Sequence, residues 1–203
     1  MTEPKYHLEG IVRTKTEEME DFEGPLDVIL ELLSKNKIEI QDVSITAILE
    51  QYLAYARKVF RSRGMPEELA CLAIVESGYK ADARSHAGAV GAWQFMPGTG
   101  KMYGLEQDWW HDERLDAYEA TEAAASYLQK LYGQFGDWPT AIAAYNAGEG
   151  KMRRAMQASG GKDFFEVTAK NHMLDDKTRL REETQQYVPR FLAVTKIMRN
   201  LPA

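Results

Sequence analysis

The sequence contains few of the residues that build disulfides or metal centres. Only one cysteine, Cys71, occurs among 203 residues, so an intrachain disulfide cannot form. Cys71 lies in an apolar run, where a free cysteine usually packs as a small buried side chain. The four histidines are scattered and lack the spacing of zinc ligands. We therefore expect no disulfide, no metal site and no cofactor.

Long apolar runs and a net positive charge are also absent. No stretch approaches the roughly 18 apolar residues of a membrane-spanning helix. The first 24 residues are polar and acidic and contain no apolar signal core. The formal net charge of −6 argues against nucleic acid as the main partner. As written, the sequence predicts a cytoplasmic chain without a transmembrane segment.

What is present indicates a globular, mostly α-helical chain. Hydrophobic residues make up 44% and charged residues 28%, which suits one domain with or without a small appendage. Apolar residues recur at helical spacing, and strand signals are sparse. One predicted helix begins at Pro25. The others cover 44–61, 66–77, 115–131, 138–145, 150–158 and 180–200. We expect a short strand at 38–40, a structured loop over 79–103, and a kink or restart at Pro189.

Glu76 stands out because it follows seven consecutive apolar residues, 69–75. A buried carboxyl keeps its proton to higher pH than an exposed one, since burial disfavours the charged form. A protonated carboxyl near neutral pH is what cleavage of a glycosidic bond requires, because the leaving oxygen must receive a proton. The alternative is that Glu76 lies at the exposed C-terminal end of its helix and does no chemistry.

Two further segments place amides beside aromatic side chains. Gln94 lies between Trp93 and Phe95, and Asn146 follows Tyr145 at a predicted helix end. Apolar surfaces with a few polar groups are typical of ligand sites. Taken singly, the aromatic residues could be core residues and Asn146 a helix cap. Together with Glu76 they favour a sugar-binding cleft.

Four segments occur in a characteristic order: ES at 76–77, GAWQFMPGTG at 91–100, AYNAG at 144–148 and ETQQYVP at 183–189. On these segments the sequence resembles the family 1 lytic transglycosylases, which have a goose-lysozyme-like catalytic domain. The resemblance covers about 52–200. Within this family, the sequence is most similar to the murein transglycosylase D type. One departure is Lys80-Ala81, where family members often have proline. The resemblance implies a mostly α, lysozyme-like domain that cleaves peptidoglycan in the cell envelope or periplasm.

The resemblance also implies roles for individual residues. Glu76 would protonate the oxygen between N-acetylmuramic acid and N-acetylglucosamine and then deprotonate the muramyl C6 hydroxyl, closing a 1,6-anhydro ring without water. Tyr187 would hydrogen-bond and position Glu76. The residues expected to contact substrate are Ser77, Ser85, Gln94, Met96, Tyr145 and Asn146. A hydrolytic lysozyme is the alternative within the same class, and it would need a second carboxylate or an activated water.

The N-terminal part contains the segments FEGPLD at 22–27, KNKIEI at 35–40 and EQYL at 50–53. On these segments, residues 6–55 resemble a different family, the start of the kleisin called segregation and condensation protein A. It implies a cytoplasmic protein partner of chromosome segregation, which conflicts with a cell-wall enzyme. We predict a kleisin-like segment over 1–51 and a catalytic domain over 52–203. The alternative is that the segment is only a helical appendage packed on the catalytic domain.

Overall fold

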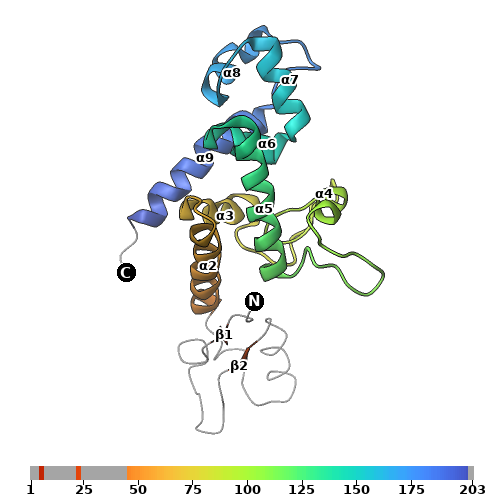
Figure 1. Cartoon of the computed structure of the whole chain (residues 1–203), viewed down its shortest axis with the longest axis vertical. Helices are drawn as coiled ribbons and strands as arrows, with labels where there is room; N and C mark the ends of the chain where they lie inside the picture. The colour runs from red at the N-terminus through yellow and green to blue at the C-terminus, as the bar shows by residue number, and fades with distance from the viewer. Residues whose placement is uncertain (1–4, 7–21, 24–44, 201–203) are drawn as a thin grey trace.

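A computed structural model describes residues 5–6, 22–23 and 45–200, and within them the regular secondary structure is helical apart from one pair of two-residue strands (Figure 1). Its elements are β1 (Lys5–Tyr6), β2 (Phe22–Glu23), α2 (Ile45–Ser62), the 3-10 helix η2 (Glu67–Cys71), α3 (Leu72–Ser77), α4 (Pro97–Met102), α5 (Ala117–Phe135), α6 (Trp138–Ala147), α7 (Glu149–Ser159), α8 (Phe164–Lys170), the 3-10 helix η3 (Asn171–Met173) and α9 (Glu182–Arg199). β1 and β2 pair antiparallel. The mostly α fold class is confirmed. The helix expected at Pro25 and the strand at 38–40 lie outside the described residues, as does most of the predicted appendage.

The core forms around α5, which lies at the centre of the molecule (Figure 1). The α5 face that is fully buried carries residues at helical spacing: Ala120, Ala124, Leu128 and Leu131. Its alanines are small, which allows neighbouring helices to approach closely. α5 packs against α2 and α6, and α6 packs in turn against α7 and α9. This arrangement brings the C-terminal helix next to segments from the middle of the chain.

The helix ends follow ordinary capping chemistry. Asp116, Asp137 and Asp163 precede α5, α6 and α8, and each carboxylate accepts hydrogen bonds from backbone N–H groups of the first turn. Gly136 and Gly160 end α5 and α7 in the left-handed conformation, with φ of 69° and 66°. These caps fix where the central helices start and stop, and hence where their end residues face the site.

Several elements differ from the sequence prediction. The expected loop 79–103 contains the short helix α4, whose PGTGKM sequence has no apolar periodicity. α8 was not predicted. The expected helix over 66–77 divides into η2 and α3. α9 continues through Pro189 as one helix and does not restart. α2 runs without a break across residue 52, so the proposed domain division at that point stays a prediction.

The segment 84–116, which contains α4, is held together by a buried arginine. Arg114 pairs with Asp112 (Nη2 to Oδ2, 2.7 Å), and its Nη1 donates to the Gly88 and Phe95 carbonyls at 3.1 Å each. At Gly91, which has a φ of 83°, a Cβ atom would lie 1.8 Å from the Arg114 carbonyl oxygen. Only glycine allows this close approach. The loop that carries Gln94 therefore rests directly on the Arg114 segment.

Candidate active site

Glu76 lies on the last turn of α3, where the chain leaves the core. The residues before it, Leu72 and Ala73, are fully buried. α3 ends at Gly78 in the left-handed conformation (φ 65°), so the helix stops one turn beyond the buried run. Glu76 itself is half-buried. The carboxyl group is thus held at the boundary between the core and a surface that a substrate can reach.

Tyr187 of α9 donates a hydrogen bond from its hydroxyl to Oε1 of Glu76. This predicted contact between residues 111 positions apart is present in the structure. Burial raises the pKa of Glu76 to about 7, against the lowering effect of the Tyr187 hydrogen bond, and the nearby carboxylate of Glu183 raises it further. A large share of the Glu76 side chains is therefore protonated at neutral pH, as a general acid requires.

A cavity of about 230 Å³ contains several of the predicted substrate residues. Glu76 does not line it, but it lies near enough to one lining residue, Tyr145, to affect the pKa of that phenol. It is lined by Gln94, Phe95, Met96, Thr99, Tyr127, Tyr145, Asn146, Ala147 and Gly148. The lining comes from the loop before α4, from α4 itself, from α5 and from the C-terminal end of α6. We call this cavity the cleft. Its aromatic and aliphatic walls with two amides have the composition of a sugar site.

Gln94 and Met96 form one wall of the cleft. Gln94 has a φ of 50°, which is unusual for a residue with a side chain. Its Nε2 donates to the carbonyls of Gly91 (2.8 Å) and Ala83 (3.2 Å), which fixes the amide in place. Met96 is 44% exposed and lines the cleft. Strained backbone of this kind occurs at functional sites because the surrounding contacts support it.

Tyr145 and Asn146, near the C-terminal end of α6, also line the cleft. The Tyr145 hydroxyl donates to the Trp93 carbonyl (2.9 Å), so it ties α6 to the Gln94 loop. Burial raises the pKa of Tyr145 well above its ordinary value, with a further contribution from Glu76, which lies nearby. Asn146 accepts from the Thr184 hydroxyl through Oδ1 (2.8 Å). Among the described residues no hydrogen bond uses its Nδ2, which leaves a donor for a ligand.

The two serines predicted to contact substrate, and the tryptophan beside Gln94, have mainly structural contacts. Ser77 donates to the Ala92 carbonyl (2.9 Å), so it joins α3 to the Gln94 loop and does not bond Glu76. Ser85 lies in an exposed turn, where its Oγ accepts from the Ala89 N–H (2.9 Å), and it does not line the cleft. Substrate contact by either serine stays a prediction. Trp93 is fully buried in the core.

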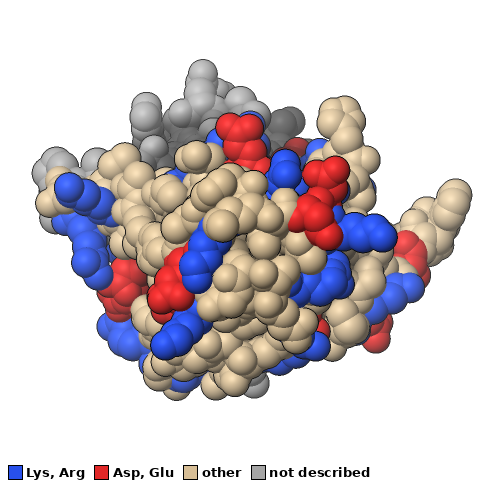
Figure 2. All heavy atoms as spheres, turned by 90° about the horizontal axis from the view of Figure 1, so that it is seen from above, with Lys and Arg blue, Asp and Glu red and all other residues tan. Residues whose placement is uncertain are grey.

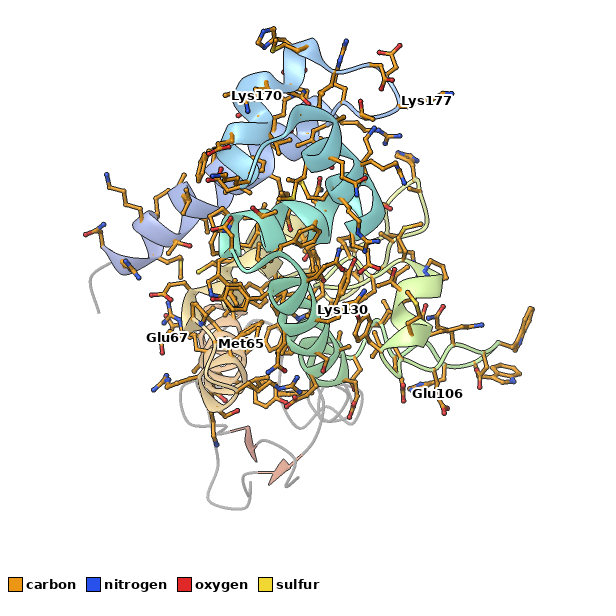
Figure 3. The ribbon with its side chains drawn as sticks, turned by 45° about the horizontal axis from the view of Figure 1, so that its top comes forward. Met65, Glu67, Glu106, Lys130, Lys170 and Lys177 are labelled. Carbon is orange, nitrogen blue, oxygen red and sulfur yellow. The ribbon has the colours of Figure 1, made fainter. Side chains whose placement is uncertain are left out.

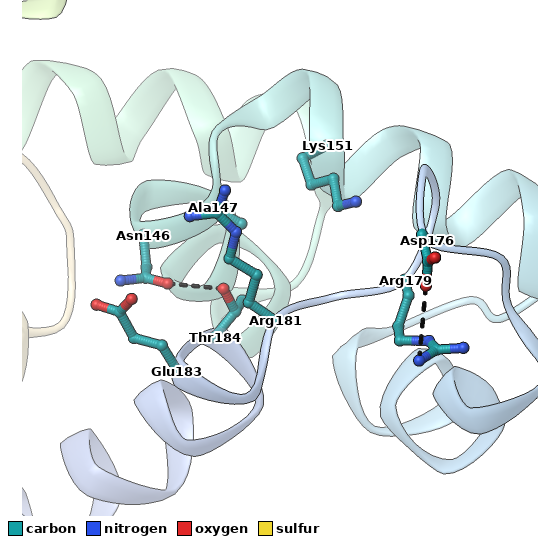
Figure 4. Close-up of a pocket in the computed structure, with 8 residues that line it drawn as sticks. All are labelled: Asn146, Ala147, Lys151, Asp176, Arg179, Arg181, Glu183 and Thr184. Carbon is teal, nitrogen blue, oxygen red and sulfur yellow. Dashed lines mark hydrogen bonds and ion pairs between the residues drawn. The ribbon is translucent and has the colours of Figure 1, made fainter. Parts of the chain in front are cut away.

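A second cavity of about 340 Å³ shares Asn146 and Ala147 with the cleft (Figure 4). Glu183, which lines it, is the residue that sequence reasoning missed: it lies close enough to raise the pKa of Glu76. Glu183 opens the ETQQYVP segment, which carries part of the family resemblance. Nothing in that segment indicates that the Glu183 side chain lies near Glu76. Figure 4 shows the Glu183 carboxylate beside the Asn146 amide.

Charge on the described surface is mixed. On the face shown in Figure 2, basic and acidic side chains are interspersed, which does not form the continuous basic surface typical of nucleic-acid binding. Among the described residues, no group of three or more His, Cys, Asp or Glu could hold a metal ion. Within that same part of the chain, no helix has the length and apolar character to cross a membrane.

Comparison with known proteins identifies the class to which this fold and site belong. The sequence model of the transglycosylase SLT domain matches residues 55–168. The membrane-bound lytic murein transglycosylase D of Escherichia coli is 37% identical over 171 residues, which is 82% of this chain and 35% of that protein. The chain belongs to the transglycosylase SLT domain family, and it spans about a third of the length of this curated relative.

Solved structures agree with the family. An inactive glutamate-to-glutamine variant of the lytic transglycosylase Slt from Pseudomonas aeruginosa matches with a TM-score of 0.58 and 25% identity, over 83% of this chain and 26% of that one. The 70 kDa soluble lytic transglycosylase Slt70 of Escherichia coli, at 1.65 Å, matches with a TM-score of 0.57 and 26% identity, over 76% of this chain and 26% of that one. A complex of the 70 kDa soluble lytic transglycosylase with bulgecin A matches with a TM-score of 0.58 and 28% identity, over 85% and 28%. The lysozyme-like helical fold is thereby confirmed.

The second resemblance is also found among curated proteins. Segregation and condensation protein A of Streptococcus mitis is 62% identical over 37 residues, which is 18% of this chain and 15% of that protein. The match is short, and the kleisin-like residues 6–55 fall mostly outside the described part of the chain. The sequence therefore belongs to one family and, over a short segment, is similar to a member of another.

Because the pKa of Glu76 is raised, replacing this residue should increase the stability of the folded protein at high pH, although it should remove activity. Below about pH 4.5 the carboxyl is protonated whether the chain is folded or not, so ionisation costs nothing. Between pH 4.5 and about 7 only the unfolded chain ionises it, and stability falls by about 3 kcal/mol in total. Glu76→Gln should therefore be more stable than wild type by about 3 kcal/mol at pH 8 and equal to it at pH 4. Urea unfolding at both pH values measures the difference; equal stabilities at pH 8 would contradict a raised pKa.

Arg114→Lys should destabilise the protein although the charge is kept. Lysine lacks the planar fork that lets Arg114 bind Asp112 and two backbone carbonyls together, so we expect a loss of about 2 kcal/mol in urea unfolding. The matched control is Arg61→Lys, whose ion pair with Glu67 is 68% exposed at the arginine and should cost less than about 1 kcal/mol. Equal losses in the two variants would contradict the role of Arg114.

Proposed function

We propose that the chain is a peptidoglycan lytic transglycosylase that cuts the β-1,4 bond between N-acetylmuramic acid and N-acetylglucosamine and acts at the cell envelope. The observation that carries the proposal is the Glu76 carboxyl, which Tyr187 hydrogen-bonds and whose pKa burial raises to about 7. Membership of the SLT domain family supports it. So does the neighbouring Slt structure, in which a single glutamate-to-glutamine change is described as inactive.

In the proposed reaction Glu76 acts twice. Its proton goes to the oxygen of the leaving N-acetylglucosamine as the bond from the muramyl C1 breaks. The resulting carboxylate takes the proton of the muramyl C6 hydroxyl, whose oxygen bonds to C1 and closes the anhydro ring. Proton and charge therefore return to their starting state without water. A pKa near 7 suits both steps, because neither protonation state is strongly favoured.

The surrounding residues would orient the substrate for these steps. Tyr187 fixes the carboxyl that it hydrogen-bonds, and we propose that Gln94, Met96, Tyr145 and Asn146 hold the sugar rings in the cleft. The free Asn146 amide can donate to an N-acetyl carbonyl, and Met96 offers an apolar surface to a ring. Fixed groups of this kind lower the barrier because little motion remains to be lost.

The test is digestion of purified peptidoglycan with the products weighed by mass spectrometry. Muropeptides one water lighter than the hydrolytic products support the transglycosylase. Glu183 gives the hydrolytic alternative a physical basis, since a second carboxylate near the acid can activate water. Products with hydrolytic masses would therefore mean that the protein is a lysozyme and not a transglycosylase. If folded protein releases no product, the proposed enzyme function is wrong.

A second candidate function concerns the N-terminal segment 1–51. Its similarity to segregation and condensation protein A favours binding of a protein partner of that system. A pull-down with the partners of that protein should recover the full chain and fail after deletion of residues 1–50. If the deletion changes only stability, the segment is a packed appendage and this candidate is wrong.

A further inference from the structure

Two tryptophans project from the loop between α4 and α5. Trp109 is 86% and Trp110 90% exposed, and their rings meet edge to face at 6.2 Å and 85°. We call residues 104–116 the tryptophan loop. Exposing two large rings to water is unfavourable, and tryptophan is a frequent anchor residue at binding surfaces. The rings are not needed for the core, so their exposure calls for a ligand.

The tip of the loop is held by hydrogen bonds within it. Asp108 Oδ1 accepts from the N–H groups of Trp110 and His111, both at 2.7 Å, and the Asp108 N–H donates to the His111 carbonyl at 2.8 Å. Below the tip, Glu106 and Glu113 exchange two further bonds. These contacts hold the rings apart from the body of the protein before any ligand binds. A preorganised loop loses little conformational entropy on binding.

The base of the loop is attached to the wall of the cleft. Gln107 Nε2 donates to the Pro97 carbonyl (3.1 Å), and Arg114 donates to the Phe95 carbonyl. Phe95 lines the cleft, as do Met96 and Thr99 next to Pro97. The tip of the loop projects outward from the body of the protein (Figures 1 and 3). Neither tryptophan lines the cleft, so a ligand on the tip would lie outside it.

The charge of the loop selects between classes of ligand. The tryptophan loop contains five carboxylates, on Glu106, Asp108, Asp112, Glu113 and Asp116, and one arginine. An anionic membrane surface attracts basic segments, so this loop is poorly matched to it. Neutral sugars offer hydroxyl donors to carboxylates and apolar ring faces to aromatic side chains. The loop chemistry thus fits a neutral glycan better than an anionic bilayer.

We propose that the tryptophan loop binds the neutral N-acetylglucosamine units of a second, neighbouring glycan strand in the insoluble polymer, outside the cleft. The identity of this polymer rests on the proposed function, and the binding itself does not. A contact of this kind holds the protein on the insoluble substrate between cuts. A variant without the two tryptophans should therefore cut intact peptidoglycan more slowly. It should cut short soluble pieces normally, because these bind only in the cleft.

The first experiment measures binding without cleavage. The full chain carrying Glu76→Gln is sedimented with purified insoluble peptidoglycan, with and without Trp109→Ala and Trp110→Ala. We expect these two changes to weaken binding at least about tenfold, because truncated aromatic anchors account for much of an interface's affinity. The matched control removes two exposed apolar side chains elsewhere, Phe165→Ala and Met173→Ala, 52% and 74% exposed, and should bind unchanged. Equal binding of all forms overturns the proposal.

Two more measurements separate the alternatives. With Glu76 intact, the tryptophan variant should cut a soluble tetrasaccharide of alternating N-acetylglucosamine and N-acetylmuramic acid at the wild-type rate and insoluble peptidoglycan more slowly. Slower cutting of both means that the loop serves the cleft, which overturns the proposal. The tryptophan variant is also tested for binding to phosphatidylethanolamine–phosphatidylglycerol vesicles. If it loses binding to these vesicles but keeps its binding to peptidoglycan, the proposal is overturned. If wild type releases no product while loop-dependent binding persists, the proposed function fails and this inference stands.

Discussion

Glu76→Gln is expected to abolish release of anhydromuramyl products, with a rate loss of about 10³-fold or more. Glutamine has nearly the same shape and keeps an oxygen that can accept the Tyr187 hydrogen bond. It can neither give a proton to the leaving oxygen nor take one from the C6 hydroxyl. Because one group would serve both steps, a single substitution removes the acid and the base together. Digestion of peptidoglycan followed by mass analysis of the products measures the loss.

The control for this variant is Glu50→Gln, which makes the same change in an exposed side chain of α2. It should retain the wild-type rate. The Glu76 variant should also remain folded, and at pH 8 it should be more stable than wild type. Loss of activity through unfolding is thereby separated from loss of chemistry. A Glu76→Gln protein that still releases anhydro products near the wild-type rate would show that another group supplies the proton.

Much of the fold follows from local patterns in the sequence. α5 was predictable because its alanines and leucines recur on one face, although the helix passes Gly133 and ends only at Gly136. α4 was not, since a helix beginning Pro-Gly and containing a second glycine has no apolar stripe. At Pro189 the sequence predicts a kink or restart, and this residue lies at an exposed position within α9, which continues through it as one helix.

The site was predictable to a different degree. A carboxyl after seven apolar residues indicates a raised pKa on physical grounds, and the pKa of about 7 agrees with that reasoning. The partners of Glu76 come from distant segments, and only family resemblance suggested Tyr187. The proximity of Glu183 depends on how α9 packs against α3 and α6, which no local pattern encodes. For the same reason the exposure of Trp109 and Trp110 could not be read from the sequence.

Tyr187→Phe is expected to lower the rate and to move the pH profile in a defined direction. The hydrogen bond from Tyr187 lowers the pKa of Glu76, so its loss raises that pKa above about 7. The acid form is the one that starts the reaction, and kcat/KM falls as pH rises through the pKa of the free enzyme. The alkaline limb should therefore shift to higher pH. The plateau should fall by about 10²-fold, because the carboxyl loses the contact that orients it.

Tyr145→Phe provides the matched comparison, since it removes the same atom from another buried phenol near Glu76. Its hydroxyl donates to the Trp93 carbonyl and not to the carboxyl, so its loss changes the cleft without changing the hydrogen bonds of Glu76. The Tyr145 variant should keep its alkaline limb at the wild-type pH whatever happens to its rate. A limb that stays in place or moves to lower pH in Tyr187→Phe would mean that this tyrosine does not set the protonation of Glu76. The pair of profiles thus distinguishes a residue that tunes the acid from one that only shapes the cleft around it.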